Sequence, residues 1–143
     1  MTILYAEDDI DDFLFFCEVI ETIDPTIQCV NATTGIEALE MLDRIDTLPD
    51  FIFIDINMPA MDGKACLKDI KNDPRLKSIP VIIYSTSNSP MDIEQCMQLG
   101  AAAYLVKPHS FDDIVASLSK IVTGKLRNDN AHSDITNVAG NNK

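Results

Sequence analysis

The sequence lacks the features that direct proteins to membranes or nucleic acids. No apolar run approaches the roughly 20 residues that a membrane-spanning helix needs. The N-terminus carries neither the basic segment nor the cleavage site of a signal peptide. Positive charge is scarce, because 11 Lys and Arg residues stand against 23 Asp and Glu residues, a formal net charge of −12. With no Lys/Arg run to form a basic patch, we expect no binding to nucleic acid or membranes.

The chain also lacks a paired-cysteine motif. Its four cysteines are scattered, and no two form a CxxC pair: Cys17, Cys29, Cys66 and Cys96. This spacing favours buried, reduced thiols over a disulfide or metal framework, and hence a cytoplasmic location.

The apolar residues predict a single α/β domain, which suits a length of 143 residues. Five short runs are near-continuous, as expected for strands buried on both faces: Ile3–Ala6, Ile27–Val30, Phe51–Ile54, Val81–Tyr84 and Ala103–Val106. Segments with helical spacing lie between and after them, the clearest at 111–122. Strand and helix thus alternate five times, which predicts a parallel sheet with helices on both faces.

Local signals mark several helix ends. Thr34 with Glu37 reads as a capping box, and Ser89 and Ser110 are placed to cap the next helices. Gly124 is a helix stop. The segment 125–143 is rich in Asn and poor in apolar residues, so we divide the chain into a domain at 1–124 and a disordered tail at 125–143.

Charged and hydroxyl side chains follow four of the five apolar runs. They are Glu7 and Asp8, Asp55, Ser85, and Lys107. In an open parallel sheet, ligands bind beyond the carboxyl ends of the strands, so these groups are expected at one edge. A buried aspartate without a partner costs several kcal/mol, which argues that Asp55 belongs to such a site.

This group of residues predicts phosphoryl chemistry. The carboxylates of Glu7, Asp8 and Asp55 would repel one another unless a cation lies between them. Oxygen ligands without a nearby His or Cys suit Mg²⁺, or Mn²⁺ in its place. Lys107 supplies a second positive charge and Ser85 a hydroxyl, so Asp55 could attack phosphorus and form an acyl phosphate.

Four motifs resemble those of response-regulator receiver domains, in the order and at the spacing of that family. They are "ILYAEDD", "IDINMPAMDG", "VIIYSTS" and "AAAYLVKP". The resemblance implies a flavodoxin-like, doubly wound sheet of five parallel strands in the order 2-1-3-4-5. It is strongest for single-domain, chemotaxis-regulator-like members, and the stretch 73–82 resembles the stand-alone receivers associated with phytochromes.

The resemblance also implies a role for each site residue. Asp55 matches the phosphoacceptor and Lys107 the lysine of the family. The metal ligands matched are Asp8 directly, Glu7 mostly through water, Asp55, and the backbone carbonyl of Asn57.

The switch residues follow from the same resemblance. Ser85 matches the hydroxyl residue that turns towards the phosphoryl group, and Tyr104 the aromatic that then swings inward. Pro108 matches a proline whose peptide bond is cis. Asn57 and Ser87 occupy positions that tune hydrolysis.

The implied function is that of a stand-alone response regulator in a two-component phosphorelay. A sensor histidine kinase or a histidine phosphotransfer protein would be the donor, and an unidentified downstream protein the partner; a homodimer is compatible with the family. We expect no enzyme activity beyond self-catalysed phosphotransfer and autodephosphorylation.

Two alternative functions remain. A phosphatase of the haloacid-dehalogenase type would need an aspartate where Asn57 stands, and a phosphate-indifferent scaffold would not need the acidic residues, hydroxyl and lysine together.

Overall fold

The structure is a computed structural model in which residues 1–124 are described, and the tail predicted at 125–143 lies outside them. The strands are β1 (Thr2–Ala6), β2 (Gln28–Ala32), β3 (Phe51–Ile54), β4 (Val81–Ser85) and β5 (Ala103–Val106). The helices are α1 (Ile10–Ile23), α2 (Gly35–Arg44), α3 (Gly63–Asn72), α4 (Pro90–Gln98) and α5 (Phe111–Val122). The five predicted strands are confirmed to within one or two residues at each end.

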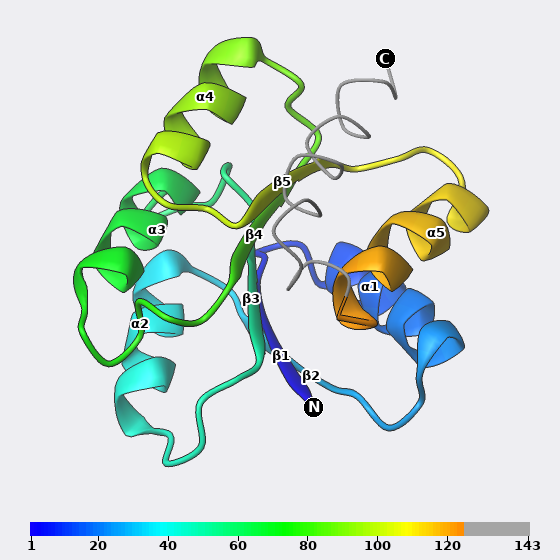
Figure 1. Cartoon of the computed structure of the whole chain (residues 1–143), viewed down its shortest axis with the longest axis horizontal. Coiled ribbons are helices and arrows are strands. Elements are labelled where there is room, and N and C mark those ends of the chain that lie inside the picture. Colours follow the sequence, from blue (N-terminus) through cyan, green and yellow to red (C-terminus); the bar gives the residue numbers. More distant parts are fainter. Residues whose placement is uncertain (125–143) are drawn as a thin grey trace.

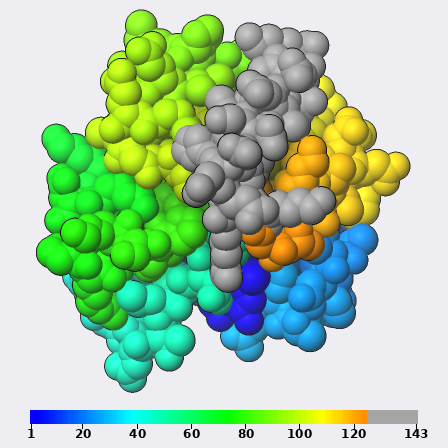
Figure 2. Space-filling model, in the orientation of Figure 1, coloured from blue at the N-terminus to red at the C-terminus, as the bar shows by residue number. Residues whose placement is uncertain are grey.

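The strands form one parallel sheet in the order β2-β1-β3-β4-β5, as predicted. Helices α1 and α5 cover one face, and α2, α3 and α4 cover the other (Figure 1). The same division separates two flanks on the space-filling surface (Figure 2). Ala6 of β1 is paired with Ile54 of β3, so Glu7 and Asp55 leave neighbouring strands side by side.

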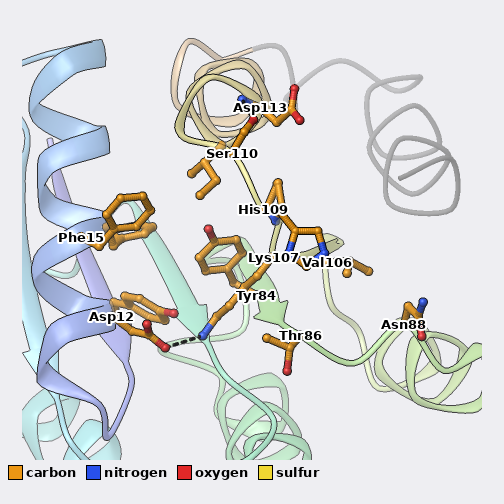
Figure 3. A pocket seen from close by; sticks show the side chains of 14 residues that line it. Asp12, Phe15, Tyr84, Thr86, Asn88, Val106, Lys107, His109, Ser110 and Asp113 are labelled. Atoms are coloured by element: carbon orange, nitrogen blue, oxygen red, sulfur yellow. Dashed lines mark hydrogen bonds and ion pairs between the residues drawn. The ribbon is translucent and has the colours of Figure 1, made fainter. Parts of the chain in front are cut away.

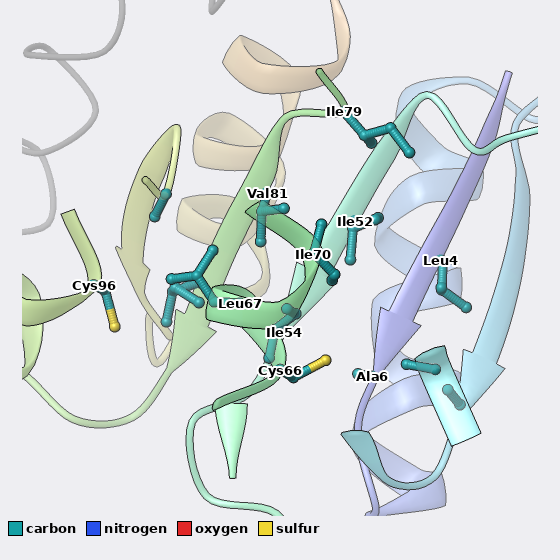
Figure 4. Packing of buried hydrophobic residues seen from close by; sticks show 14 of the residues in the cluster. Leu4, Ala6, Ile52, Ile54, Cys66, Leu67, Ile70, Ile79, Val81 and Cys96 are labelled. Atoms are coloured by element: carbon teal, nitrogen blue, oxygen red, sulfur yellow. The ribbon is translucent and has the colours of Figure 1, made fainter. Parts of the chain in front are cut away.

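The two faces of the sheet bury different side chains. Beneath α2, α3 and α4 the cluster is mainly aliphatic, as Leu67 and Ile70 packing against β3 and β4 illustrate (Figure 4). Beneath α1 and α5 the cluster is rich in aromatic rings, among them Tyr5, Phe16 and Phe53. The ring centroids of Phe16 and Phe53 lie 5.1 Å apart in an edge-on arrangement. Helices α1 and α5, which flank Lys107, therefore pack on a layer of aromatic side chains.

Strand β2 corrects one expectation. Its run was predicted to be buried on both faces, but the strand alternates in burial, and Val30 is 36% exposed. The reason is its place at the edge of the sheet, where only β1 pairs with it.

The predicted helix caps are confirmed. The Thr34 hydroxyl accepts a hydrogen bond from the Glu37 amide at 3.0 Å, while Ser89 and Ser110 cap α4 and α5. The reciprocal bond of the predicted capping box differs, because the Glu37 carboxylate accepts from the Thr33 amide at 2.9 Å. Gly124 follows α5 with a φ of +92°, a conformation that favours glycine. These caps fix the starts of the helices that follow the strand ends, and so the loops that carry the site.

The cysteine prediction is right for two residues of four. Cys66 and Cys96 are buried, but Cys17 and Cys29 are only partly so; all four are free thiols. No helix within residues 1–124 combines the length and the apolar character that crossing a membrane would require.

Candidate functional site

The predicted side chains from β1, β3 and β5 meet beyond the carboxyl end of the sheet. The ammonium of Lys107 donates to the Glu7 carboxylate at 2.8 Å and to the Asp55 carboxylate at 3.2 Å. These residues are far apart in the sequence, and the parallel register of the strands brings them together. Three of the predicted site residues therefore form one charged cluster.

This cluster is largely withdrawn from water. Glu7 is 1% exposed and Asp55 is 8% exposed. Burial raises the pKa of Glu7, and the hydrogen bond from Lys107 opposes that rise. Burial alone would lower the pKa of Lys107, but the Glu7 hydrogen bond and the charge of Asp55 outweigh it, so the net shift is upward. The lysine is therefore firmly protonated between two acidic groups.

The backbone behind Asp55 is closely packed. The Asn57 amide donates to the Asp55 carboxylate at 3.1 Å. Gly63, the first residue of α3, donates its amide to the Ile56 carbonyl at 2.9 Å. A Cβ at Gly63 would lie 2.5 Å from the Asp55 carbonyl oxygen and 2.7 Å from the Ile56 Cα. Asp62 caps α3, and the glycine that follows it permits this close approach.

The two switch residues, Ser85 and Tyr104, lie against one loop residue, Ser87. The Ser85 hydroxyl is fully buried and accepts a hydrogen bond from the Ser87 amide at 3.3 Å. The Tyr104 hydroxyl donates to the Ser87 carbonyl at 2.8 Å, and burial raises its pKa to about 12.

Tyr104 is 0% exposed and packs into the aliphatic cluster. The ring therefore already occupies the inward position that we expected it to reach when the Ser85 hydroxyl turns. The contacts that hold it there come from the protein itself, namely the Ser87 carbonyl and the apolar side chains around the ring.

The predicted cis bond before Pro108 is wrong for this structure. Residues 1–124 contain no cis peptide bond. The trans form of an X–Pro bond is intrinsically favoured by about 0.5–1 kcal/mol. Here the trans bond still leaves the Lys107 ammonium in contact with both carboxylates, so the geometry of the site does not require the cis form.

The predicted metal ligands are only partly assembled. Glu7 and Asp55 face the same ammonium, whereas Asp8 and Asn57 are exposed residues of the adjoining loops. Within residues 1–124, no three His, Cys, Asp or Glu side chains are grouped as ligands of one ion. The donor chemistry fits a hard divalent cation, since every candidate ligand is an oxygen.

A pocket of about 450 Å³ lies beside Lys107, between α1 and the loops that follow β4 and β5 (Figure 3). Two of its residues were missed in the sequence. Asp12 accepts a third hydrogen bond from the lysine at 3.4 Å, and the Tyr84 ring centroid lies 5.5 Å from the same ammonium. For Asp12, the available signal was its place in the first turn of a helix that follows an acidic run. His109 is exposed and lines this pocket.

Comparison with known proteins gives an independent view of this arrangement. The family described as the response regulator receiver domain matches residues 3–119. Protein PilG of Pseudomonas aeruginosa is 34% identical over 110 residues, which cover 76% of this chain and 81% of that protein. Two other curated relatives are longer, and the chain matches 13% of the length of one and 48% of the other.

Solved structures agree with the sequence relatives. The Mn²⁺-bound form of response regulator Rcp1, a protein of Synechocystis, is similar with a TM-score of 0.76 and 28% identity, over 87% of this chain and 94% of that one. The phosphorylated cyanobacterial phytochrome response regulator RcpA is similar with a TM-score of 0.78 and 28% identity, over 88% and 93% of the two chains. Fold and sequence therefore point to the same family.

Proposed function

Because this chain belongs to the receiver-domain family of response regulators in two-component signalling, we propose that it is a stand-alone switch whose Asp55 accepts a phosphoryl group. The donor is the phosphohistidine of a sensor histidine kinase or of a histidine phosphotransfer protein. The observation that carries the proposal is the Lys107 ammonium, which contacts Asp55 and the buried Glu7 at the carboxyl end of the sheet.

The proposed transfer is an in-line displacement at phosphorus. A carboxylate oxygen of Asp55 forms the new O–P bond while the N–P bond of the donor breaks, and the electron pair of that bond returns to the donor imidazole. Lys107 offsets the negative charge of the phosphoryl oxygens, and the Ser85 hydroxyl donates a hydrogen bond to one of them. Water later hydrolyses the acyl phosphate, at a rate that the side chains of Asn57 and Ser87 tune.

The proposed metal is Mg²⁺, with Mn²⁺ as a substitute. Asp8 and Asp55, the Asn57 carbonyl, and Glu7 through water would hold it. When bound, the ion supplies positive charge that offsets the repulsion between the carboxylates and the incoming phosphoryl group. The manganese-bound state of the similar Rcp1 supports this assignment.

The donor protein is proposed to dock on α1 beside the site. Ile10 and Leu14 are 56% and 53% exposed. Phe15 of α1 packs edge-on against Phe111 of α5, with 5.9 Å between the ring centroids. Acidic residues at the start of α1 flank this apolar surface, so a donor helix with apolar and basic residues fits it. Leu14→Ser should slow transfer from the donor protein but not phosphorylation by acetyl phosphate; equal rates with the protein donor would contradict this docking site.

The output is proposed to leave through the face formed by α4, β5 and α5. Tyr104 of β5 is hydrogen-bonded to the loop that precedes α4, so a phosphoryl group that increases the population of one arrangement of this loop affects this face directly. The same face is available for a downstream protein or for a second copy of the chain.

The free thiols at Cys17, Cys29, Cys66 and Cys96 agree with a cytoplasmic location.

Phosphorylation itself is tested with acetyl phosphate and Mg²⁺. The intact mass should increase by one phosphoryl group in the wild type and in Asp69→Asn, an exposed control on α3, but not in Asp55→Asn. Chelation of the metal should abolish the increase. An unchanged wild-type mass, or a modified Asp55→Asn, would contradict the proposal. Steady turnover of para-nitrophenyl phosphate would favour the phosphatase alternative.

A further inference from the structure

A second lysine lies near the site, on the opposite side of it from α1. Lys64 in the first turn of α3 donates to Asp92 in the first turn of α4 at 2.7 Å. It also donates to Gln95 of α4 at 2.5 Å. Lys64 and Asp92 line a shallow cleft of about 460 Å³ that also includes Asn57, whose amide is bonded to Asp55. This ion pair therefore joins two helices next to the phosphoacceptor loop.

Ser87 connects the Lys64–Asp92 ion pair to the switch residues Ser85 and Tyr104. The Ser87 hydroxyl donates to the second carboxylate oxygen of Asp92 at 2.6 Å. The same Ser87 donates its amide to the Ser85 hydroxyl and accepts the Tyr104 hydroxyl on its carbonyl. All three polar groups of Ser87 are thus engaged, one by α4 and two by the switch residues.

The charges of the pair agree with this geometry. Hydrogen bonds from Lys64 and then from Ser87 hold the pKa of Asp92 below its usual range. The hydrogen bond to Asp92 raises the pKa of Lys64. Asp92 is therefore ionised at neutral pH and able to accept from both donors at once.

We infer that Lys64 and Asp92 are positioning residues of the phosphorylation switch, which hold Ser87 so that Ser85 is oriented and Tyr104 stays inward before phosphoryl transfer. The inference rests on the proposed function. Its physical basis is preorganisation: a loop already held in the arrangement that the phosphoryl group requires loses less conformational freedom when that group arrives. The pair acts on the reaction only through Ser87, and touches neither Asp55 nor Lys107.

The test measures binding of beryllofluoride, a phosphoryl analogue, with Mg²⁺ in the wild type and in Lys64→Met, Asp92→Asn and Ser87→Ala. Each variant should bind the analogue about two- to fivefold more weakly, the range expected when a partly exposed ion pair or one hydrogen bond is lost. Ser87→Ala combined with Asp92→Asn should be no weaker than either alone, because both changes interrupt the same connection. Hydrogen exchange at the Ser87 amide should become faster in Lys64→Met and Asp92→Asn, with or without the analogue.

Two controls separate positioning from general stability. Gln95→Ala removes the other acceptor of Lys64 without touching Ser87, and Lys68→Met changes an exposed lysine one turn along α3. Both should bind the analogue as the wild type does. Wild-type affinity in Asp92→Asn, tighter binding in any of the three variants, or additive losses in the double variant would overturn the inference. Failure of the wild type itself to bind the analogue would instead refute the proposed function.

Discussion

The surroundings of two lysines differ: Lys107 contacts Asp55 directly, and Lys64 lies in the cleft that contains Asn57. The side chain of Lys107 is 14% exposed, and the side chains of its partners Glu7 and Asp55, taken without their backbone atoms, are 2% and 11% exposed. Lys64 and its partner Asp92 are 26% and 27% exposed. Removing one member of a buried pair leaves an uncompensated charge, whereas an exposed pair is screened by water and salt. We therefore expect the loss of Lys107 to cost more stability than the loss of either member of the partly exposed pair.

The largest effect is expected for Lys107→Met. In metal-free buffer this change should lower the free energy of unfolding by about 3 kcal/mol, because two buried carboxylates lose their positive partner. Urea unfolding measures the difference, with the exposed Lys120→Met as the control. Mg²⁺ should recover part of the loss, since a cation bound only to the folded state stabilises it. Equal stabilities of the Lys107→Met variant and its control would remove the contrast between the two lysines.

Gly63→Ala should have the next largest effect. Its Cβ would press on backbone atoms of Asp55 and Ile56, which cannot move aside as a flexible side chain can. We expect a loss of about 1–3 kcal/mol in the free energy of unfolding. Gly35→Ala is the control, because a Cβ there would lie no closer than 3.0 Å to any surrounding atom, the nearest being the Met61 carbonyl oxygen, so a shift of a few tenths of an ångström accommodates it. If the Gly63 variant is no less stable than the control, the loop behind Asp55 is less rigid than the structure indicates.

The smallest effect on stability is expected for Lys64→Met. The loss should stay below about 1 kcal/mol and shrink further at high salt, as for other exposed ion pairs. Urea unfolding at low and high salt, with Lys68→Met beside it, provides the measurement. A loss as large as that of Lys107→Met would show that the two pairs do not differ in the way their exposure suggests.

Much of the site could be predicted from the sequence because it follows from strand ends. Parallel strands place their carboxyl ends at one edge, so the sequence alone assigns Glu7, Asp55, Ser85 and Lys107 to that edge. Two expectations failed. The burial of β2 depends on its edge position in the sheet, and the cis bond before Pro108 was implied by the family resemblance alone.

The contacts made by residues outside the motifs could not be predicted. Asp12 reaches Lys107 from α1, and Asp92 joins Lys64 to Ser87 across two helices and a loop. A place in the first turn of a helix does not single these residues out, because exposed lysines and aspartates are common there and most have no such partner.

The amino-acid sequence alone determined the order of strands and helices, the helix caps and the family to which the chain belongs, because these depend on local periodicity and on motifs that are continuous in the chain. The tertiary structure decided which charges are buried and which are exposed, and through which residues the switch is connected to its surroundings. These properties depend on distances between segments far apart in the sequence. The 2.7 Å between the Lys64 ammonium on α3 and the Asp92 carboxylate on α4 is a property of neither helix by itself.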